Sequence, residues 1–143
     1  MAKLFNLKVL TPEKQFFDGA AESLTVTTTD GRFEFLADHV PTIMPLVVGT
    51  LLIKAPEGTI EVFNSEGFLE VRHDGVLVYI QACEKPDEIN KQRAEDARLR
   101  AEEHLRQQQS MQEYQQSKMA LARAMARLSV SRRDGFGGGN PPV

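Results

Sequence analysis

The sequence is poor in residues on which several common protein classes depend. Its 143 residues include one cysteine (Cys83), no tryptophan and two tyrosines. A single cysteine cannot form an internal disulfide or a cysteine-based zinc site, so a reducing compartment is expected. The formal net charge of -3 argues against a general nucleic-acid-binding protein.

Long apolar segments are also missing. No apolar run approaches the ~20 residues of a membrane-spanning helix. The start, MAKLFN, has neither the apolar core of a signal peptide nor the Arg and Ser bias of a transit peptide. We therefore expect the chain to remain in the compartment where it is synthesised.

Catalytic and metal-binding motifs are absent as well. The three histidines, His39, His73 and His104, have no ligand-spaced companions, and no G-x-S-x-G, P-loop or Rossmann glycine pattern occurs. The carboxylates are scattered, so no general acid/base pair can be named. This predicts no metal site, no catalytic residue and no required cofactor, and favours a binding or coupling module over an enzyme.

What is present divides the chain in two. Residues 1–86 carry 7 Lys and Arg against 12 Asp and Glu, whereas the remainder carries 10 against 8. The first part also holds 21 β-branched residues and seven of the eight Phe, while the second holds three β-branched residues. Because such side chains suit strands and disfavour helices, we predict an α+β protein. Its parts are a β domain (1–86), a helical domain (87–133) and a disordered Gly-rich tail (134–143).

The first part has the pattern of an antiparallel β-sandwich or barrel. Short alternating segments recur between Asp-Gly and similar turn signals, where glycine supplies the positive φ of tight hairpins. The predicted strands are 4–10, 15–17, 24–28, 32–36, 51–54, 59–63, 67–72 and 76–82. Between them, Pro41 and Pro45 interrupt an apolar stretch, so residues 38–46 are predicted to form an exposed loop for a partner contact.

The second part predicts two antiparallel helices. Pro86 and two acids mark a helix start, and Ala94, Ala97 and Ala101 form a narrow stripe of small side chains at helical spacing. Three glutamines (107–109) precede a capping-box pattern at Ser110, after which a second apolar stripe is predicted from Met111, Tyr114, Leu121, Met125 and Leu128. A hairpin joined by so little apolar surface is marginally stable and can open.

The second helix is strongly basic. Residues 114–133 contain no acid and five cations, which are Lys118, Arg123, Arg127, Arg132 and Arg133. One interpretation is a solvated face whose cations the helix macrodipole favours. The other is a docking face for an acidic partner or an anion.

Several motifs together resemble the epsilon subunit of the bacterial F-type ATP synthase over residues 3–131. They include Asp38-His39-Val40-Pro41, Gly67-Phe68-Leu69-Glu70-Val71, Ile89-Asn90-Lys91-Gln92-Arg93-Ala94 and the Ala122-Arg123-Ala124-Met125-Ala126-Arg127-Leu128 segment. The resemblance implies a non-catalytic rotor subunit on the cytoplasmic face of the cell membrane, attached through its complex. Its partners are then the gamma subunit, the c-ring and the alpha and beta subunits, with no nucleic acid.

The resemblance also assigns residues to contacts. The sandwich meets gamma and the c-ring through a set comprising Arg32, His39, Val40, Pro41, Ile43 and Met44. Arg32 and Glu34 depart from the family pattern, which has an acid and a glycine at these positions. In the extended hairpin, Lys118, Arg123 and Arg127 meet acidic segments of alpha and beta and block ATP hydrolysis.

Some bacterial relatives bind ATP in the folded hairpin as a regulatory ligand through an I-D-x-x-R-A motif. The matching positions are Glu84, Ile89, Arg93, Arg100, Arg123 and Arg127, while Asn90 replaces the aspartate. This amide exchanges one acceptor for a donor and weakens a ribose or amino contact by about 1–3 kcal/mol. The alternative function is a free-standing adaptor whose basic C-terminal helix binds an acidic protein or RNA.

Overall fold

A computed structural model describes residues 2–107 and 110–134. The chain divides into two compact units, Met1–Cys83 and Glu84–Val143, and each is described by itself. The predicted tail lies outside the described residues, apart from its first residue.

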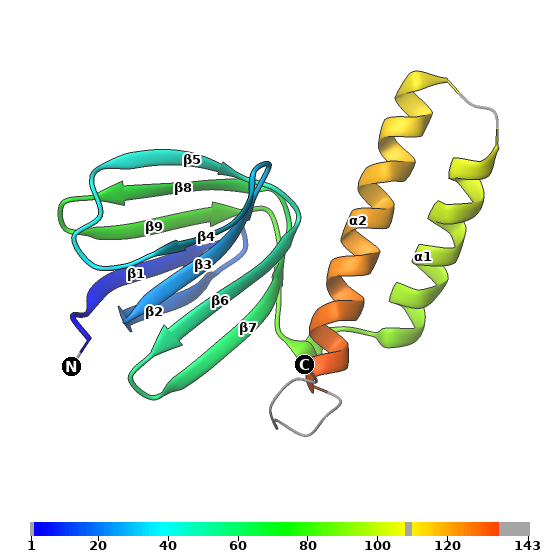
Figure 1. The fold of residues 1–143 in the computed structure, drawn as a ribbon. Coiled ribbons are helices and arrows are strands. Elements are labelled where there is room, and N and C mark those ends of the chain that lie inside the picture. Colours follow the sequence, from blue (N-terminus) through cyan, green and yellow to red (C-terminus); the bar gives the residue numbers. More distant parts are fainter. Residues whose placement is uncertain (1, 108–109, 135–143) are drawn as a thin grey trace. The chain divides into compact units, whose positions relative to one another are not determined.

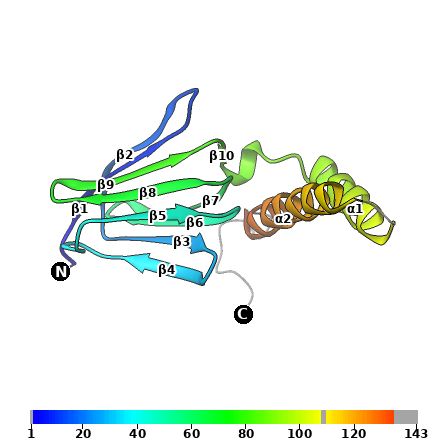
Figure 2. The same ribbon diagram turned by 90° about the horizontal axis from the view of Figure 1, so that it is seen from above.

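The first unit is built from two five-stranded sheets (Figures 1 and 2). One has the order β2-β1-β9-β8-β5 and the other β10-β7-β6-β3-β4. The strands are β1 (Phe5–Leu10), β2 (Gln15–Ala21), β3 (Ser23–Thr28), β4 (Gly31–Phe35), β5 (Thr42–Leu46), β6 (Gly49–Ala55), β7 (Gly58–Asn64), β8 (Gly67–Arg72), β9 (Gly75–Ile80) and β10 (Cys83–Glu84). The predicted antiparallel sandwich is confirmed, with β1 and β9 paired in parallel.

The core lies between the two sheets, because alternate residues of each strand face inward. In the first sheet Leu7 and Val78 are fully buried, and in the second Leu51 and Ile53 are. All four belong to one hydrophobic cluster. Each such side chain contributes about 1.5–3 kcal/mol on burial, which is how a sequence rich in Val, Ile and Leu stabilises a small sandwich.

The prediction of a loop over residues 38–46 is wrong in its second half. Residues Thr42–Leu46 form β5, which pairs antiparallel with β8 and lies at the edge of its sheet. Proline has no backbone N–H to donate to a neighbouring strand. An edge strand tolerates Pro45 because it has a neighbouring strand on one side only. The predicted exposure of Val40 and Ile43, at 69% and 72%, is confirmed, whereas Met44 packs against the core.

The second unit contains a short 3-10 turn, η1 (Pro86–Glu88), and two long helices, α1 (Lys91–Arg106) and α2 (Met111–Asp134). The helices lie side by side and run in opposite directions (Figures 1 and 2), which confirms the predicted hairpin. α1 begins later than Pro86 because the Asn90 side chain caps it, accepting the Arg93 N–H at 3.0 Å. Ser110 Oγ similarly accepts the Glu113 N–H at 3.2 Å.

The interface between the helices is made of small side chains. Ala94 and Ala101 of α1 and Ala124 of α2 are buried, together with Leu128. The apolar stripe predicted for α2 is therefore partly wrong, since Met111, Tyr114 and Met125 are exposed. The helices approach through alanines and Leu128, while Met111, Tyr114 and Met125 face solvent. Among the described residues, no helix is long and apolar enough to cross a membrane.

Candidate functional site

A cavity of about 330 Å³ lies within the helical unit. Four alanines, two from each helix, leave the space that a larger side chain would fill. The lining comprises Glu84, Glu88, Asn90, Arg93, Ala94, Ala97, Arg100, Ala120, Arg123, Ala124 and Arg127. The structure therefore brings together six of the seven residues predicted for an ATP site.

The seventh residue, Ile89, is not in the cavity lining. It lies between η1 and α1, where its backbone N–H donates to the Pro86 carbonyl at 3.3 Å. Sequence reasoning missed Glu88 and the roles of Ala97 and Ala120. The signal that points to the cavity is the helical spacing of small residues, which equally predicts close packing of the two helices.

One bidentate ion pair borders the cavity. Arg127 donates from Nε to Glu84 Oε1 and from Nη2 to Glu84 Oε2, both at 2.9 Å. The two side chains are 32% and 26% exposed, so water screens this pair less than a pair on the open surface. It ties α2 to the segment that precedes η1.

The other arginines of the two helices whose side chains the structure describes divide into two kinds. Arg98 pairs with Glu95 and Glu102, and its hydrogen bonds to these carboxylates raise its pKa. Arg106 pairs with Glu103 at 3.2 Å. Within the described residues, the guanidinium groups of three other arginines have no carboxylate partner. These are Arg93, Arg100 and Arg123, and all three line the cavity.

This arrangement is suited to an anion. Four arginines and two glutamates give the lining an excess of positive charge. Each guanidinium presents five N–H donors in a planar fork that matches phosphate or carboxylate oxygens. Among the described residues, no group of three His, Cys, Asp or Glu side chains could hold a metal ion.

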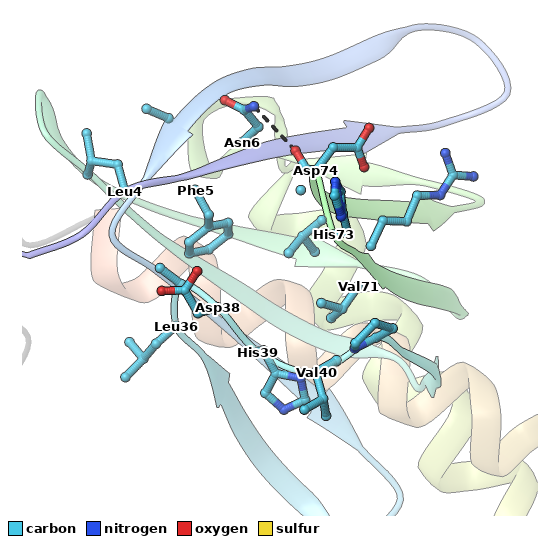
Figure 3. Close-up of a pocket in the computed structure, with 16 residues that line it drawn as sticks. Leu4, Phe5, Asn6, Leu36, Asp38, His39, Val40, Val71, His73 and Asp74 are labelled. Atoms are coloured by element: carbon cyan, nitrogen blue, oxygen red, sulfur yellow. Dashed lines mark hydrogen bonds between the residues drawn. The ribbon is translucent and has the colours of Figure 1, made fainter.

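The residues predicted for the contact with the c-ring and gamma fall into two places. His39, Val40 and Pro41 line a cavity of about 520 Å³ in the sandwich unit. Figure 3 shows Leu36, Asp38, His39 and Val40 on one side of this cavity, and Asn6, His73 and Asp74 on the other. Ile43 and Met44 do not line it.

The loop that bears His39 is held in a defined shape. Asp38 has a positive φ of 64° and forms an ion pair with Lys3 at 2.6 Å. The His39 ring packs edge-on against Phe35, with centroids 4.8 Å apart, and its Nδ1 lies 2.8 Å from the Val40 carbonyl oxygen. These contacts leave the apolar side chain of Val40 exposed at the rim.

Arg32 lies elsewhere, at the start of β4. Its Nη1 donates to Thr27 Oγ1 at 3.0 Å and to the Thr50 carbonyl at 2.7 Å. The residue therefore links β4 to β3 and β6. The loop that carries His39 follows the opposite end of β4.

The residues predicted to contact alpha and beta are also divided. Arg123 and Arg127 line the cavity of the helical unit, called the arginine cavity from here on because four arginines line it. Lys118 is exposed on α2 outside this cavity. The two arginines are four residues apart and share a helix face. A ligand in the cavity and a partner on this face would therefore use the same side chains.

Comparison with known proteins identifies both units. Residues 4–86 match the family model described as the ATP synthase delta/epsilon chain beta-sandwich domain, and residues 87–132 match the long alpha-helix domain of the same chain. The ATP synthase epsilon chain of Caldanaerobacter subterraneus subsp. tengcongensis is 46% identical over 134 residues, covering 93% of this chain and 97% of the relative. That of Ruminiclostridium cellulolyticum is 45% identical, covering 90% and 96%.

Solved structures share the fold. A chain in the Euglena gracilis mitochondrial ATP synthase structure, which comprises OSCP, F1 and the c-ring, aligns with a TM-score of 0.79 at 20% identity. The alignment covers 90% of this chain and 81% of that one. The two domain matches and the close relatives show that this chain belongs to the ATP synthase delta/epsilon family, as a non-catalytic chain.

Proposed function

We propose that the chain is a central-stalk subunit of a proton-translocating rotary ATP synthase and regulates ATP hydrolysis through its helical hairpin. In this proposal, ATP in the arginine cavity is the regulatory ligand. The observation that carries it is the gathering of Arg93, Arg100 and Arg123 in a cavity of about 330 Å³, where none of the three has a carboxylate partner among residues 2–107 and 110–134. Elsewhere on α1, Arg98 and Arg106 have glutamate partners.

ATP binding stabilises the folded hairpin in this proposal. Arg93 and Arg100 belong to α1 and Arg123 belongs to α2, so the complete site exists only while the helices lie together. A ligand that binds one state alone shifts the equilibrium toward it by RT ln(1 + [L]/Kd), about 2.7 kcal/mol at a hundredfold excess over Kd. Because alanine contacts bury little apolar area, a binding free energy of this size is enough to shift the equilibrium between the folded and the open hairpin.

The same arginines would act in inhibition. When the hairpin opens, Arg123 and Arg127 leave the cavity and, with Lys118, become available to acidic segments of the alpha and beta subunits. Because Arg123 and Arg127 cannot serve both ligands at once, ATP bound in the cavity relieves inhibition. This competition connects the cavity with the basic face of α2.

The sandwich unit would supply the rotor contacts. Val40 and Ile43 are large apolar side chains that protrude into solvent, and such exposed groups are typical of partner surfaces. We propose that this surface, together with the cavity beside His39 and Pro41 and with Met44 of β5, meets gamma and the c-ring. Arg32 contributes at the other end of β4. The chain then lies on the cytoplasmic face of the membrane, held there by its complex.

Calorimetric titration of the full chain with ATP tests the regulatory proposal. We expect saturable binding, abolished by Arg123→Gln, which removes one guanidinium from the cavity. Arg106→Gln is the matched control, because Arg106 lies outside the cavity and pairs with Glu103. No heat at millimolar ATP would contradict the proposal.

Copurification tests the wider assignment against the adaptor alternative. We expect the chain to copurify with alpha, beta and gamma from membranes after detergent extraction. Salt-sensitive retention of RNA by the isolated chain, without these partners, would instead support an adaptor.

A further inference from the structure

The loop between β4 and β5 carries an exposed apolar side chain on an unusual backbone. Val40 is 69% exposed and lines the cavity of the sandwich unit. Two residues before it, Asp38 has a positive φ of 64°, which residues other than glycine rarely adopt. Pro41, which follows Val40, has no backbone N–H to donate. Outside the strands, none of the backbone hydrogen bonds of the described residues involves this loop (36–41), so its shape depends on side-chain contacts.

Two side chains hold the backbone carbonyl of Val40. Thr42 Oγ1 donates to this oxygen at 2.9 Å, and His39 Nδ1 lies 2.8 Å from it. Because a carbonyl oxygen only accepts hydrogen bonds, His39 Nδ1 has to carry a proton and donate it. When the ring is neutral, Nε2 is then the nitrogen without a proton.

The His39 ring is supported in turn by two aromatic side chains. It is half-buried and meets the Phe35 ring edge-on, with centroids 4.8 Å apart, and the Phe33 ring with centroids 6.0 Å apart. Phe35 is fully buried and belongs to the hydrophobic core of the sandwich. The orientation of the imidazole is therefore fixed by the core.

These contacts form a continuous path from the core to the exposed side chain. Phe35 supports the His39 ring, and the ring holds the Val40 carbonyl. Thr42, at the start of β5, holds the same oxygen. Figure 3 shows the side chains of His39 and Val40 next to each other on the loop. A loop already fixed in one shape has little conformational entropy to lose when it binds a partner.

We propose that His39 is a positioning residue of the rotor contact, whose Nδ1–H fixes the Val40 backbone so that the Val40 side chain meets the partner. The inference rests on the rotor contact proposed above and separates the roles of two residues that the sequence predicts only as members of one contact set. In this assignment the His39 ring acts through Val40, and its Nε2 makes no essential contact with the partner.

The tautomer of His39 provides a test that needs no partner. In alkaline solution, long-range proton–nitrogen NMR spectra of the isotope-labelled full chain distinguish a protonated Nδ1 from a protonated Nε2. We expect the proton of His39 on Nδ1. His104, which is exposed on α1, is the control in the same spectrum and should show the Nε2 tautomer that a free imidazole prefers. A proton on Nε2 of His39 would overturn the inference.

Two amide substitutions at position 39 separate positioning from direct contact. The amide nitrogen of asparagine takes the place of Nδ1, and that of glutamine approaches the place of Nε2, so only His39→Asn keeps the donor to the Val40 carbonyl. The measurement is the affinity of the full chain for ATP synthase from which this chain has been removed. We expect His39→Asn to bind within about threefold of the original chain and His39→Gln to bind about tenfold more weakly, as for one lost hydrogen bond. The reverse order, or equal affinities of the two variants, would contradict the inference.

Thr42 and Val40 supply the matched variants. Thr42→Val removes the second donor to the same carbonyl, whereas Thr42→Ser keeps it, so we expect weaker binding from Thr42→Val alone. Val40→Thr places a hydroxyl in the apolar contact at nearly the same shape and should weaken binding by about tenfold. Normal binding by Thr42→Val or Val40→Thr would show that the inference is wrong. If the original chain does not bind the depleted complex, the proposed rotor function itself fails.

Discussion

Arg127 and Glu84 meet through two parallel N–H···O contacts of 2.9 Å, although 43 residues separate them in sequence. Both residues line the cavity beside Arg93, Arg100 and Arg123, for which the described part of the chain provides no carboxylate partner. The Arg127–Glu84 contact is the long-range ion pair of the described helical unit, since the other pairs there join residues three or four apart. Opening the hairpin requires that this pair be broken or exchanged.

Glu84→Gln should therefore weaken the folded hairpin. The neutral amide cannot replace the bidentate contact, so the Arg127 guanidinium, which is about one-third exposed, loses its charged hydrogen-bond partner at position 84. Exposed ion pairs contribute about 0–1 kcal/mol to stability, and breaking a buried pair costs about 3–5 kcal/mol. For this half-buried pair we expect the free energy of unfolding to fall by about 1–2 kcal/mol. Urea unfolding followed by helical circular dichroism at 222 nm measures it.

Glu103→Gln is the control for this prediction. Its partner Arg106 is 71% exposed, and Glu103 is 60% exposed. We expect the free energy of unfolding to change by less than about 0.5 kcal/mol, because solvent screens such pairs. Equal effects of the two substitutions would show that the Glu84–Arg127 pair contributes no more to the stability of the hairpin than the exposed Glu103–Arg106 pair.

Removal of the cap of α1 should also destabilise the hairpin. Asn90→Ala deletes the acceptor of the Arg93 N–H and should cost about 1 kcal/mol. Asn90→Ser retains a capping oxygen and should recover most of this loss. Thermal unfolding at 222 nm distinguishes the two, and identical melting curves for both variants would argue against the cap.

In the sandwich, Gly67 is fixed by close packing. A Cβ built at this residue would lie 1.9 Å from the Tyr79 carbonyl oxygen and 2.8 Å from Ile80 Cα, both backbone atoms. Gly67→Ala must therefore separate β8 from β9, and we expect a loss of about 3 kcal/mol, the upper end of the usual overpacking cost. The measurement is urea unfolding followed at 218 nm.

Gly19→Ala is the matched control, also in a strand. The nearest atom to its added Cβ would be 3.5 Å away, in the Phe17 ring, which is ordinary contact. We expect its stability to stay within about 0.5 kcal/mol of the original chain. A loss at position 19 equal to that at position 67 would exclude steric crowding as the cause.

The architecture could be predicted from sequence because two local signals agree with it. Alternation of β-branched residues marks the strands, and the charge and Ala pattern after Pro86 marks the helices. β5 was missed because Pro45 disfavours a strand locally, and only its place at a sheet edge makes that proline acceptable. Sheet order is a long-range property that no short segment contains.

The sequence predicts which residues form the candidate site but not which of them form ion pairs with one another. The resemblance to a family identifies Glu84 and the arginines as members of one site. Arg127 has a carboxylate partner, whereas Arg93, Arg100 and Arg123 have none in the part of the chain that the structure describes, and this difference depends on distances across the hairpin. The prediction of the apolar stripe on α2 was partly wrong because it also depends on how the two helices meet. The positions of the alanines, and not those of the methionines, decide how closely the helices approach.

Arg32 offers a test of the rotor contacts. Arg32→Glu removes the donors to Thr27 Oγ1 and the Thr50 carbonyl and places a carboxylate beside that carbonyl. We expect reduced ATP-driven proton pumping in inverted membrane vesicles that carry the variant complex. Lys54→Glu makes the same change of charge at an exposed residue near the other end of β6 and should pump normally. Unchanged pumping in Arg32→Glu would refute the prediction.

Deletion of all residues after Cys83 separates the roles of the two units. The cut follows the boundary of the compact sandwich unit, whose core cluster lies within residues 7–83. If the sandwich alone holds the chain in its complex, the truncated form should still copurify with gamma. ATP hydrolysis by the complex should rise, because the basic helix that would block it is gone. Hydrolysis at the level of the intact complex would argue against an inhibitory hairpin, and loss of copurification would show that the helices are needed for assembly.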